Sequence, residues 1–132
     1  MEQWDIYDEN KQKTGRTMNR NDWNMQPGDF HLTVLGVLRR PDGTYLITRR
    51  RMDKEWAPGC WEVSGGAAQA GEESYEAVLR EVKEETGYTL TSYRFCGLVT
   101  FVSGDGVTEY MSLFHADGFE GEQIACDEGV LE

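Results

Sequence analysis

The chain has 132 residues and a mass of 15.0 kDa, enough for one hydrophobic core but not for two. Its 24 acidic and 13 basic residues give a formal net charge of −11, which disfavours nucleic acid polymers and anionic membranes as partners. No apolar run reaches the roughly 18 residues of a membrane span and the N-terminus lacks a secretory signal pattern, so we expect no membrane association and a cytoplasmic location.

The first 30 residues are polar, and we expect them to form an irregular N-terminal extension or a hairpin. Alternation at 4–7 is typical of a short strand, a turn follows at 8–10, and a returning strand would begin at 14–16. The Pro-Gly-Asp sequence at 27–29 marks a further turn before the first long strand.

The next part of the chain is predicted to be mainly strands. A mostly apolar run at 31–39 indicates a buried strand, and the turn sequence at 41–43 predicts a hairpin whose returning strand covers 45–49. A loop closed by Pro58-Gly59 then leads to a short strand at 61–63.

One clear helix is predicted, at residues 73–86. Its apolar residues recur at intervals of three and four, as they do on one face of a helix. Gly87 is well placed as the residue just past the C-terminus of this helix. The apolar residues of the stripe are Tyr75, Val78, Leu79 and Val82.

Two strand-like runs follow the helix, at 95–102 and 108–115, with a turn at 103–106 between them. Several strands, one strong helix and hairpin turns indicate an α/β or α+β sandwich around a mixed sheet. The chain ends just after the start of another strand at 129–131, so we expect a fold that is truncated at its C-terminus. A terminal Leu-Glu is also typical of a cloning scar.

The three cysteines are odd in number and far apart, at Cys60, Cys96 and Cys126. None belongs to a C-x-x-C pair, so neither a zinc site nor a disulfide framework is expected. We interpret them as reduced thiols, of which Cys60, in a Pro-Gly loop, is the one to test for reactivity.

The acidic residues of the predicted helix have an unusual placement. Glu81, Glu84 and Glu85 span about 100° of one face, beside the buried stripe of Val78 and Val82. A charge run is usually a solvated face, but two of these acids lie near the helix C-terminus, where the macrodipole disfavours negative charge. A hard divalent cation such as Mg²⁺ takes oxygen ligands and would relieve their repulsion. It would also let a chain of charge −11 bind a phosphate-bearing substrate.

The spacing of seven residues within 66–88 resembles the signature of the Nudix hydrolases, the Nudix box. One position departs from that signature, because its final aliphatic residue is Tyr88 here. The resemblance implies that residues 1–132 form a single Nudix domain, an α/β/α sandwich with a mixed sheet. The seven matching residues are Gly66, Glu72, Arg80, Glu81, Glu84, Glu85 and Gly87.

The resemblance also implies a chemistry, the hydrolysis of a diphosphate linkage by a water molecule that Mg²⁺ or Mn²⁺ activates. By this resemblance Glu81 and Glu85 would be the main metal ligands, with the carbonyl of Gly66 as a third contact. Glu84 would be a ligand or the general base. Such an enzyme would act as a pyrophosphohydrolase on a nucleoside diphosphate-linked or other small diphosphate compound.

Two further roles follow from the same resemblance. Arg80 would orient the carboxylates by hydrogen bonding, with Glu72 as its partner. In some members of the family the general base is an acidic residue outside the box. Further candidates for the general base are therefore Glu109, Glu122 and a residue beyond the end of this chain.

Basic residues near position 50 stand out in this acidic chain. Arg49, Arg50 and Lys54 are candidates for binding a substrate phosphate, which an arginine can contact in a bidentate manner. The alternative is an exposed edge strand that is protected by charge. His31, at the start of the first long strand, is a further candidate for substrate binding, and a partly buried polar residue is its simpler interpretation.

Two tryptophans flank the Pro58-Gly59 turn. We expect Trp61 in the core, whereas Trp56 would stack on a base or line the pocket. This loop, the segment 4–9 and the Arg49-Arg50 strand resemble the branch that includes isopentenyl-diphosphate isomerase. That enzyme uses a catalytic cysteine just after the strand at 61–63, where this chain has none, so we expect a hydrolase with an isomerase-like N-terminal region.

Alternative functions remain at this point. They are an isomerase-like enzyme, a non-catalytic Nudix module that binds a nucleotide or diphosphate, and an interaction domain with an acidic helix. In each enzymatic case the expected partner is a small-molecule diphosphate and not a nucleic acid polymer. Many members of the family are homodimers, so self-association is one option.

Overall fold

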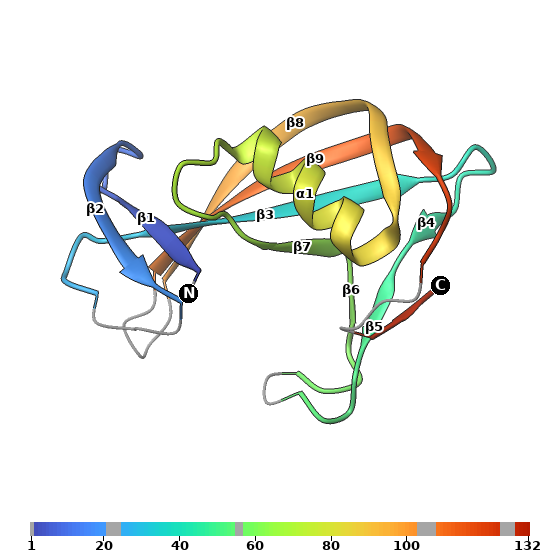
Figure 1. The fold of residues 1–132 in the computed structure, drawn as a ribbon, viewed down its shortest axis with the longest axis horizontal. Coiled ribbons are helices and arrows are strands. Elements are labelled where there is room, and N and C mark those ends of the chain that lie inside the picture. The colour runs from blue at the N-terminus through green and yellow to red at the C-terminus, as the bar shows by residue number, and fades with distance from the viewer. Residues whose placement is uncertain (1, 21–24, 55–56, 103–107, 125–128) are drawn as a thin grey trace.

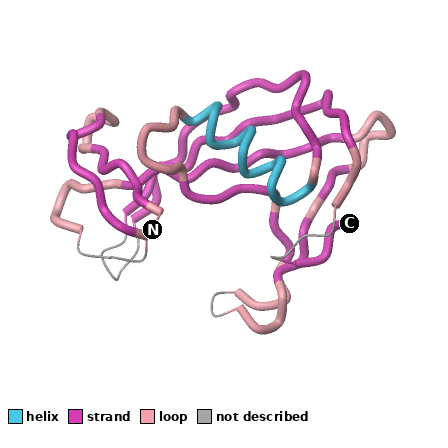
Figure 2. Tube along the Cα trace, viewed as in Figure 1, coloured by secondary structure: helices cyan, strands magenta, loops and turns pink. Residues whose placement is uncertain are grey.

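The computed structural model describes residues 2–20, 25–54, 57–102, 108–124 and 129–132 (Figure 1). Strands make up most of the described chain, and one α-helix lies across them (Figure 2). Within the described residues, no helix has the length and apolar character needed to cross a membrane. The elements are β1 (Gln3–Tyr7), β2 (Lys13–Asn19), β3 (His31–Arg39), β4 (Tyr45–Leu46), β5 (Thr48–Arg50), β6 (Trp61–Glu62), β7 (Ser64–Ala67), α1 (Ser74–Thr86), β8 (Tyr88–Val102), β9 (Thr108–Gly121) and β10 (Gly129–Leu131).

The central sheet is mixed, with the order β4-β3-β9-β8 and with β7 also paired to β3. Strands β3 and β9 run parallel, with His31 opposite Glu109, whereas β7, β4 and β8 are antiparallel to their neighbours. The predicted α/β fold around a mixed sheet is therefore confirmed. The two glycines at 65–66, which follow the short strand predicted at 61–63, lie in a strand of their own, β7, which pairs with residues 33–36 of β3.

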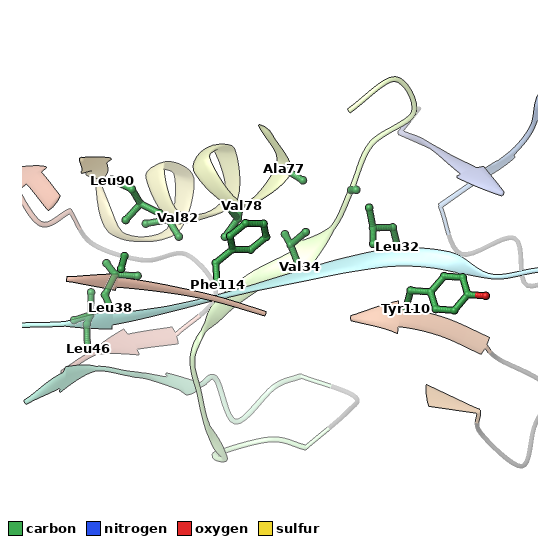
Figure 3. Close-up of a cluster of buried hydrophobic side chains, with 12 residues drawn as sticks. Leu32, Val34, Leu38, Leu46, Ala77, Val78, Val82, Leu90, Tyr110 and Phe114 are labelled. Atoms are coloured by element: carbon green, nitrogen blue, oxygen red, sulfur yellow. The ribbon is translucent and has the colours of Figure 1, made fainter. Parts of the chain in front are cut away.

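Helix α1 covers one face of this sheet and supplies much of the core. Val78 and Val82 are completely buried and pack with Val34 of β3 and Phe114 of β9 (Figure 3). Burial of each such valine contributes about 1.5–3 kcal/mol. The helix approaches β3 closely at Gly36, where a Cβ would lie 3.0 Å from Val82 Cγ2. The predicted helix is confirmed to within one residue.

The ends of α1 follow from local chemistry. The carboxylate of Glu76 accepts a hydrogen bond from the main-chain nitrogen of Glu73 at 3.0 Å, as in a capping box. Gly87 ends the helix in the left-handed region, at φ 85°. Tyr75, which was assigned to the apolar stripe, is 52% exposed, so its assignment to the core was wrong.

The predicted hairpin after β3 is divided between two sheets. Tyr45 and Leu46 pair with β3, whereas residues 48–50 pair with β6 and β10 in a small separate sheet. The expectation that Trp61 lies in the core is wrong: it is 48% exposed in β6, with the Arg49 guanidinium 5.9 Å from its ring centroid. Cys60 and Cys96 are exposed free thiols, and Cys126 lies outside the described residues.

The N-terminal segment forms an antiparallel hairpin of β1 and β2. Trp4, Ile6 and Met18 build a small apolar cluster of their own there. The hairpin is tied to the loop before α1, because the main-chain nitrogen of Gly71 donates to the Asp5 carboxylate at 2.9 Å. The hairpin and the small sheet lie at opposite ends of the central sheet (Figure 1).

Asp29 joins this hairpin to the main sheet. Its buried carboxylate accepts two hydrogen bonds from Arg16, at 2.6 and 3.2 Å, and one from the Gln26 main chain at 3.1 Å. These hydrogen bonds, that from Arg16 first, hold the pKa of Asp29 below its usual value although burial opposes them. The Thr108 hydroxyl also donates to the Asp29 carbonyl.

We predict that Asp29→Asn lowers the free energy of unfolding by about 2 kcal/mol at neutral pH. The pKa of Asp29 is lower in the folded protein than in the unfolded chain, so ionised Asp29 stabilises the fold at pH values above the unfolded-state pKa. This stabilisation is lost as the pH falls through the folded-state pKa. The difference between wild type and variant should therefore shrink as the pH falls below about 4. Urea unfolding between pH 7 and pH 3 measures it, with Asp53→Asn, which breaks the exposed Arg51 pair, as the control. A constant difference across this range would contradict the prediction.

Candidate active site

Strand β7 and helix α1 lie side by side, and Gly66 sets how closely they approach (Figure 1). A Cβ on Gly66 would lie 2.7 Å from both Cδ and Oε1 of Glu81. Real Cβ atoms do not come so close, so glycine is needed for the Glu81 carboxylate to rest against the β7 main chain. The predicted neighbours Gly66 and Glu81 are thus brought together.

Arg80 is the centre of the hydrogen-bond network at this site. Its Nε and Nη2 donate to the two carboxylate oxygens of Glu72 at 2.8 and 3.0 Å, a bidentate pair. Nη2 also donates to the Ala67 carbonyl at 3.2 Å, and Nη1 donates to Glu81 at 3.0 Å and to Glu84 at 3.2 Å. Arg80 therefore joins β7, the loop before α1 and the acidic face of the helix.

The acidic partners of Arg80 differ in their electrostatics. Burial alone would raise the pKa of Glu72, but hydrogen bonds from Arg80 and from the Gln69 main chain lower it overall. The pKa of Arg80 is raised, chiefly by its hydrogen bonds to Glu72. For Glu81, burial dominates and raises the pKa, although Arg80 opposes this effect. Glu81 is thus a carboxylate whose charge is incompletely compensated by the protein.

Glu84 and Glu85 differ from Glu81 in their surroundings. Glu84 is 59% exposed, against 15% for the Glu81 side chain. Glu85 Oε2 accepts a hydrogen bond from the main-chain nitrogen of Gly65 at 3.2 Å. In the described part of the chain, no three His, Cys, Asp or Glu side chains converge as a preformed metal site.

The donor set nevertheless fits a hard divalent cation. Glu81, Glu84 and Glu85 offer oxygen atoms, which Mg²⁺ and Mn²⁺ prefer. Mg²⁺ also keeps several of its waters and needs few protein ligands. The buried Glu81 carboxylate, with its raised pKa, would gain from a neighbouring cation. Gly66 leaves the space beside it free of a side chain.

These groups face a cleft of about 780 Å³. Four of its lining residues, Thr33, Leu35, Glu109 and Met111, come from the parallel pair β3 and β9. About half of the lining was not predicted from the sequence, because strand pairing and the N-terminal hairpin bring it together. The full lining is Glu2, Arg20, Thr33, Leu35, Arg50, Lys54, Glu62, Val63, Gly65, Gly66, Ala67, Arg80, Glu81, Glu84, Glu85, Glu109 and Met111.

The predicted phosphate-binding residues are divided by the fold. Arg50 and Lys54 line the cleft together with the acids of α1. Arg49 is not among the lining residues, and its Nε donates to the Gly59 carbonyl at 3.1 Å. Trp56 lies outside the described residues.

His31 lies beneath the cleft and not in its lining. It is 3% exposed and stacks on Trp4, with ring centroids 4.7 Å apart. Its Nε2 lies 3.1 Å from Oε2 of Glu109, which also accepts a hydrogen bond from the Thr33 hydroxyl at 3.0 Å. This contact with His31 holds the pKa of Glu109 below its usual value although burial opposes it. Of the two acids proposed outside the box, Glu109 lines the cleft and Glu122 does not.

The fold and the site together define an α/β domain in which one helix presents a carboxylate cluster to a cleft beside a glycine-containing strand. The family model for the NUDIX domain matches residues 29–132. This chain therefore belongs to the Nudix family. The match begins after β2, so the N-terminal hairpin lies outside it.

Known proteins show the same relationship. The chain is 42% identical over 91 residues to an uncharacterized Nudix hydrolase of Listeria innocua, lin0387, covering 68% of this chain and 53% of that protein. It is 40% identical over 58 residues to the nucleoside triphosphatase NudI of Escherichia coli, covering 44% of this chain and 41% of NudI. The chain thus spans about half the length of the curated relatives it matches.

The fold also resembles solved structures. The crystal structure of DR0079 from Deinococcus radiodurans has a TM-score of 0.73 and 25% sequence identity, covering 98% of this chain and 82% of that one. The MutT protein from Methanosarcina mazei has a TM-score of 0.66 and 26% identity, covering 76% and 72%. The predicted resemblance to the isomerase branch is not confirmed by these comparisons.

Proposed function

We propose that this domain hydrolyses a diphosphate linkage in a nucleotide or other small diphosphate compound, with Mg²⁺ or Mn²⁺ as cofactor. The observation that carries the proposal is the composition of one cleft. Acidic side chains of α1 and the basic side chains of Arg50 and Lys54 line the same space. The names of the relatives, Nudix hydrolase and nucleoside triphosphatase, support it.

Glu81 and Glu85, with the carbonyl of Gly66, would hold the cation. When bound, the cation activates water for attack on phosphorus and neutralises charge that develops on the phosphoryl oxygens. Arg80 holds Glu81 and Glu84 in place through one nitrogen, while its other two nitrogens stay fixed on Glu72. These hydrogen bonds limit the motion of Glu81 and Glu84 during turnover.

The remaining residues of the cleft have separate tasks. Glu84, which is 59% exposed, would accept the proton of the attacking water. Arg50 and Lys54 bind the phosphoryl oxygens and orient the substrate. As the new oxygen–phosphorus bond forms, the bond to the bridging oxygen breaks and the second phosphate group leaves with that oxygen.

The test is a hydrolysis assay on the purified chain. Nucleoside triphosphates, nucleotide sugars, dinucleoside polyphosphates and isopentenyl diphosphate are incubated with millimolar Mg²⁺, and release of phosphate, pyrophosphate or nucleoside monophosphate is measured. We expect turnover of at least one compound, loss of turnover with EDTA and its return on addition of excess Mg²⁺. Isomerisation of isopentenyl diphosphate, or tight ligand binding without turnover, would overturn the proposal in favour of an alternative.

A further inference from the structure

Glu109 lies in the cleft but has a different setting from the acids of α1. It lies near the start of β9, opposite His31 in the parallel register with β3. Both of its described contacts, with His31 and with Thr33, are made by the same oxygen, Oε2. Within the described residues Oε1 accepts no hydrogen bond, and the side chain is 22% exposed and lines the cleft, so a ligand in the cleft can contact this carboxylate.

The orientation of the Glu109 side chain depends on its contact with the buried side chain of His31. The His31 side chain is 4% exposed, so it cannot reach the substrate itself. Trp4 covers it in a nearly parallel stack, with an interplanar angle of 12°, and Trp4 belongs to the apolar cluster of the N-terminal hairpin. This hairpin lies outside residues 29–132, which the family model matches, so His31 belongs to the matched region and Trp4 does not.

The chemistry of Glu109 suits recognition better than catalysis. An ionised carboxylate only accepts hydrogen bonds, and its partners here favour the ionised form. A strong general base would need a pKa nearer the working pH. A carboxylate fixed through one oxygen presents the other to donors on a ligand, such as the hydroxyl groups of a sugar.

The rest of the cleft supports a polar ligand. Most lining side chains are charged, and the hairpin contributes Glu2 and Arg20 to the same space. Trp4 Nε1 donates to the Glu2 carboxylate at 2.8 Å, so the tryptophan that covers His31 also positions Glu2. Few apolar residues line the cleft, so a prenyl chain would bury little apolar surface there.

We propose that Glu109, oriented by the buried His31, determines specificity by accepting hydrogen bonds from hydroxyl groups on the substituent of the diphosphate. Glu109 contacts the substrate, and His31 is a positioning residue. This inference rests on the proposed function for the presence of a diphosphate in the cleft.

The test compares a ribonucleotide that the wild type hydrolyses with its 2′,3′-dideoxy counterpart. A site that pairs with a hydroxyl group discriminates against the analogue that lacks it, so wild type should favour the ribonucleotide by at least about tenfold in kcat/KM. Glu109→Ala, which removes the acceptor, should reduce this ratio to about threefold or less by raising KM for the ribonucleotide, with kcat little changed. Glu120→Ala, which replaces an exposed acid on the same strand, is the control and should keep the wild-type ratio.

His31 is tested by two replacements. His31→Leu removes the group that contacts Glu109 and should reduce the ratio, whereas His31→Gln can still offer an amide nitrogen and should retain most of it. A purely structural role would lower kcat/KM for both nucleotides equally and leave the ratio intact. Equal losses for both nucleotides in Glu109→Ala with a fall in kcat, or a wild type without a preference, would overturn the inference.

Direct binding separates this inference from the proposed function. If no compound is hydrolysed, titration calorimetry with the two nucleotides in Mg²⁺ replaces the kinetic ratio. Tighter binding of the ribonucleotide that is lost in Glu109→Ala would uphold the recognition site although the hydrolase proposal had failed. Equal binding of the two nucleotides, or no binding of either, would overturn the inference.

Discussion

Replacing Glu85 by glutamine is expected to lower kcat/KM for the best substrate by about two to three orders of magnitude with little loss of stability. Glu85 accepts its hydrogen bond from the Gly65 main chain at 3.2 Å, and a glutamine carbonyl can accept the same bond. The contact between α1 and β7 is thereby kept, whereas the negative charge that would hold a divalent cation is removed. Initial rates over a range of Mg²⁺ concentrations, together with thermal unfolding, measure both effects.

The matched control for this variant is Glu76→Gln on the same helix. Glu76 is exposed, does not line the cleft and accepts the capping hydrogen bond from Glu73, which glutamine can also accept. It should keep the activity and the stability of the wild type. If Glu85→Gln kept more than about a tenth of the activity, or if Glu76→Gln lost as much, the charge of Glu85 would have no special role.

The acidic part of the site could be located from the sequence because its residues are close together in the chain. Helical periodicity alone places Glu81, Glu84 and Glu85 on one face, and the helix begins within one residue of the prediction. The contact between Arg80 and Glu72, which was expected from the family resemblance, is present as a bidentate pair. Local rules were sufficient here because no distant strand decides the arrangement.

The other half of the cleft depends on pairing between distant segments. Thr33 and Glu109 are 76 residues apart, and they meet through the parallel register of β3 with β9. Such a register is fixed by the complete hydrophobic pattern of the sheet and not by either strand alone. The contribution of Glu2 and Arg20 likewise depends on how the hairpin packs on the domain. The error for Trp61 has a related cause, since its strand belongs to the small sheet and leaves one face in solvent.

Alanine substitution at the two adjacent glycines of β7 should have different effects, with loss of stability at Gly65 and loss of activity at Gly66. At Gly65 a Cβ would meet the main-chain oxygen of Val34 and come within 2.7 Å of Leu35 Cδ2. Main-chain atoms of a paired strand cannot move aside without breaking the β3–β7 ladder, so Gly65→Ala should cost about 3 kcal/mol or more. We expect its yield of folded protein to fall sharply, as measured by urea unfolding and near-ultraviolet circular dichroism.

Gly66→Ala should instead leave the fold intact and remove activity. Its Cβ would lie 2.7 Å from the Glu81 carboxyl group, the far end of a side chain that can rotate away. Rotation breaks the 3.0 Å hydrogen bond with Arg80 and displaces a carboxylate that would hold the cation. We therefore expect kcat/KM to fall about a hundredfold, while the free energy of unfolding falls by about 1 kcal/mol. Because the two substitutions are chemically identical and one residue apart, a comparable loss of stability in both would show that Gly66 only allows the strand to pack. A stable but inactive Gly66→Ala would show that glycine is required there because the Glu81 carboxylate must lie against the main chain.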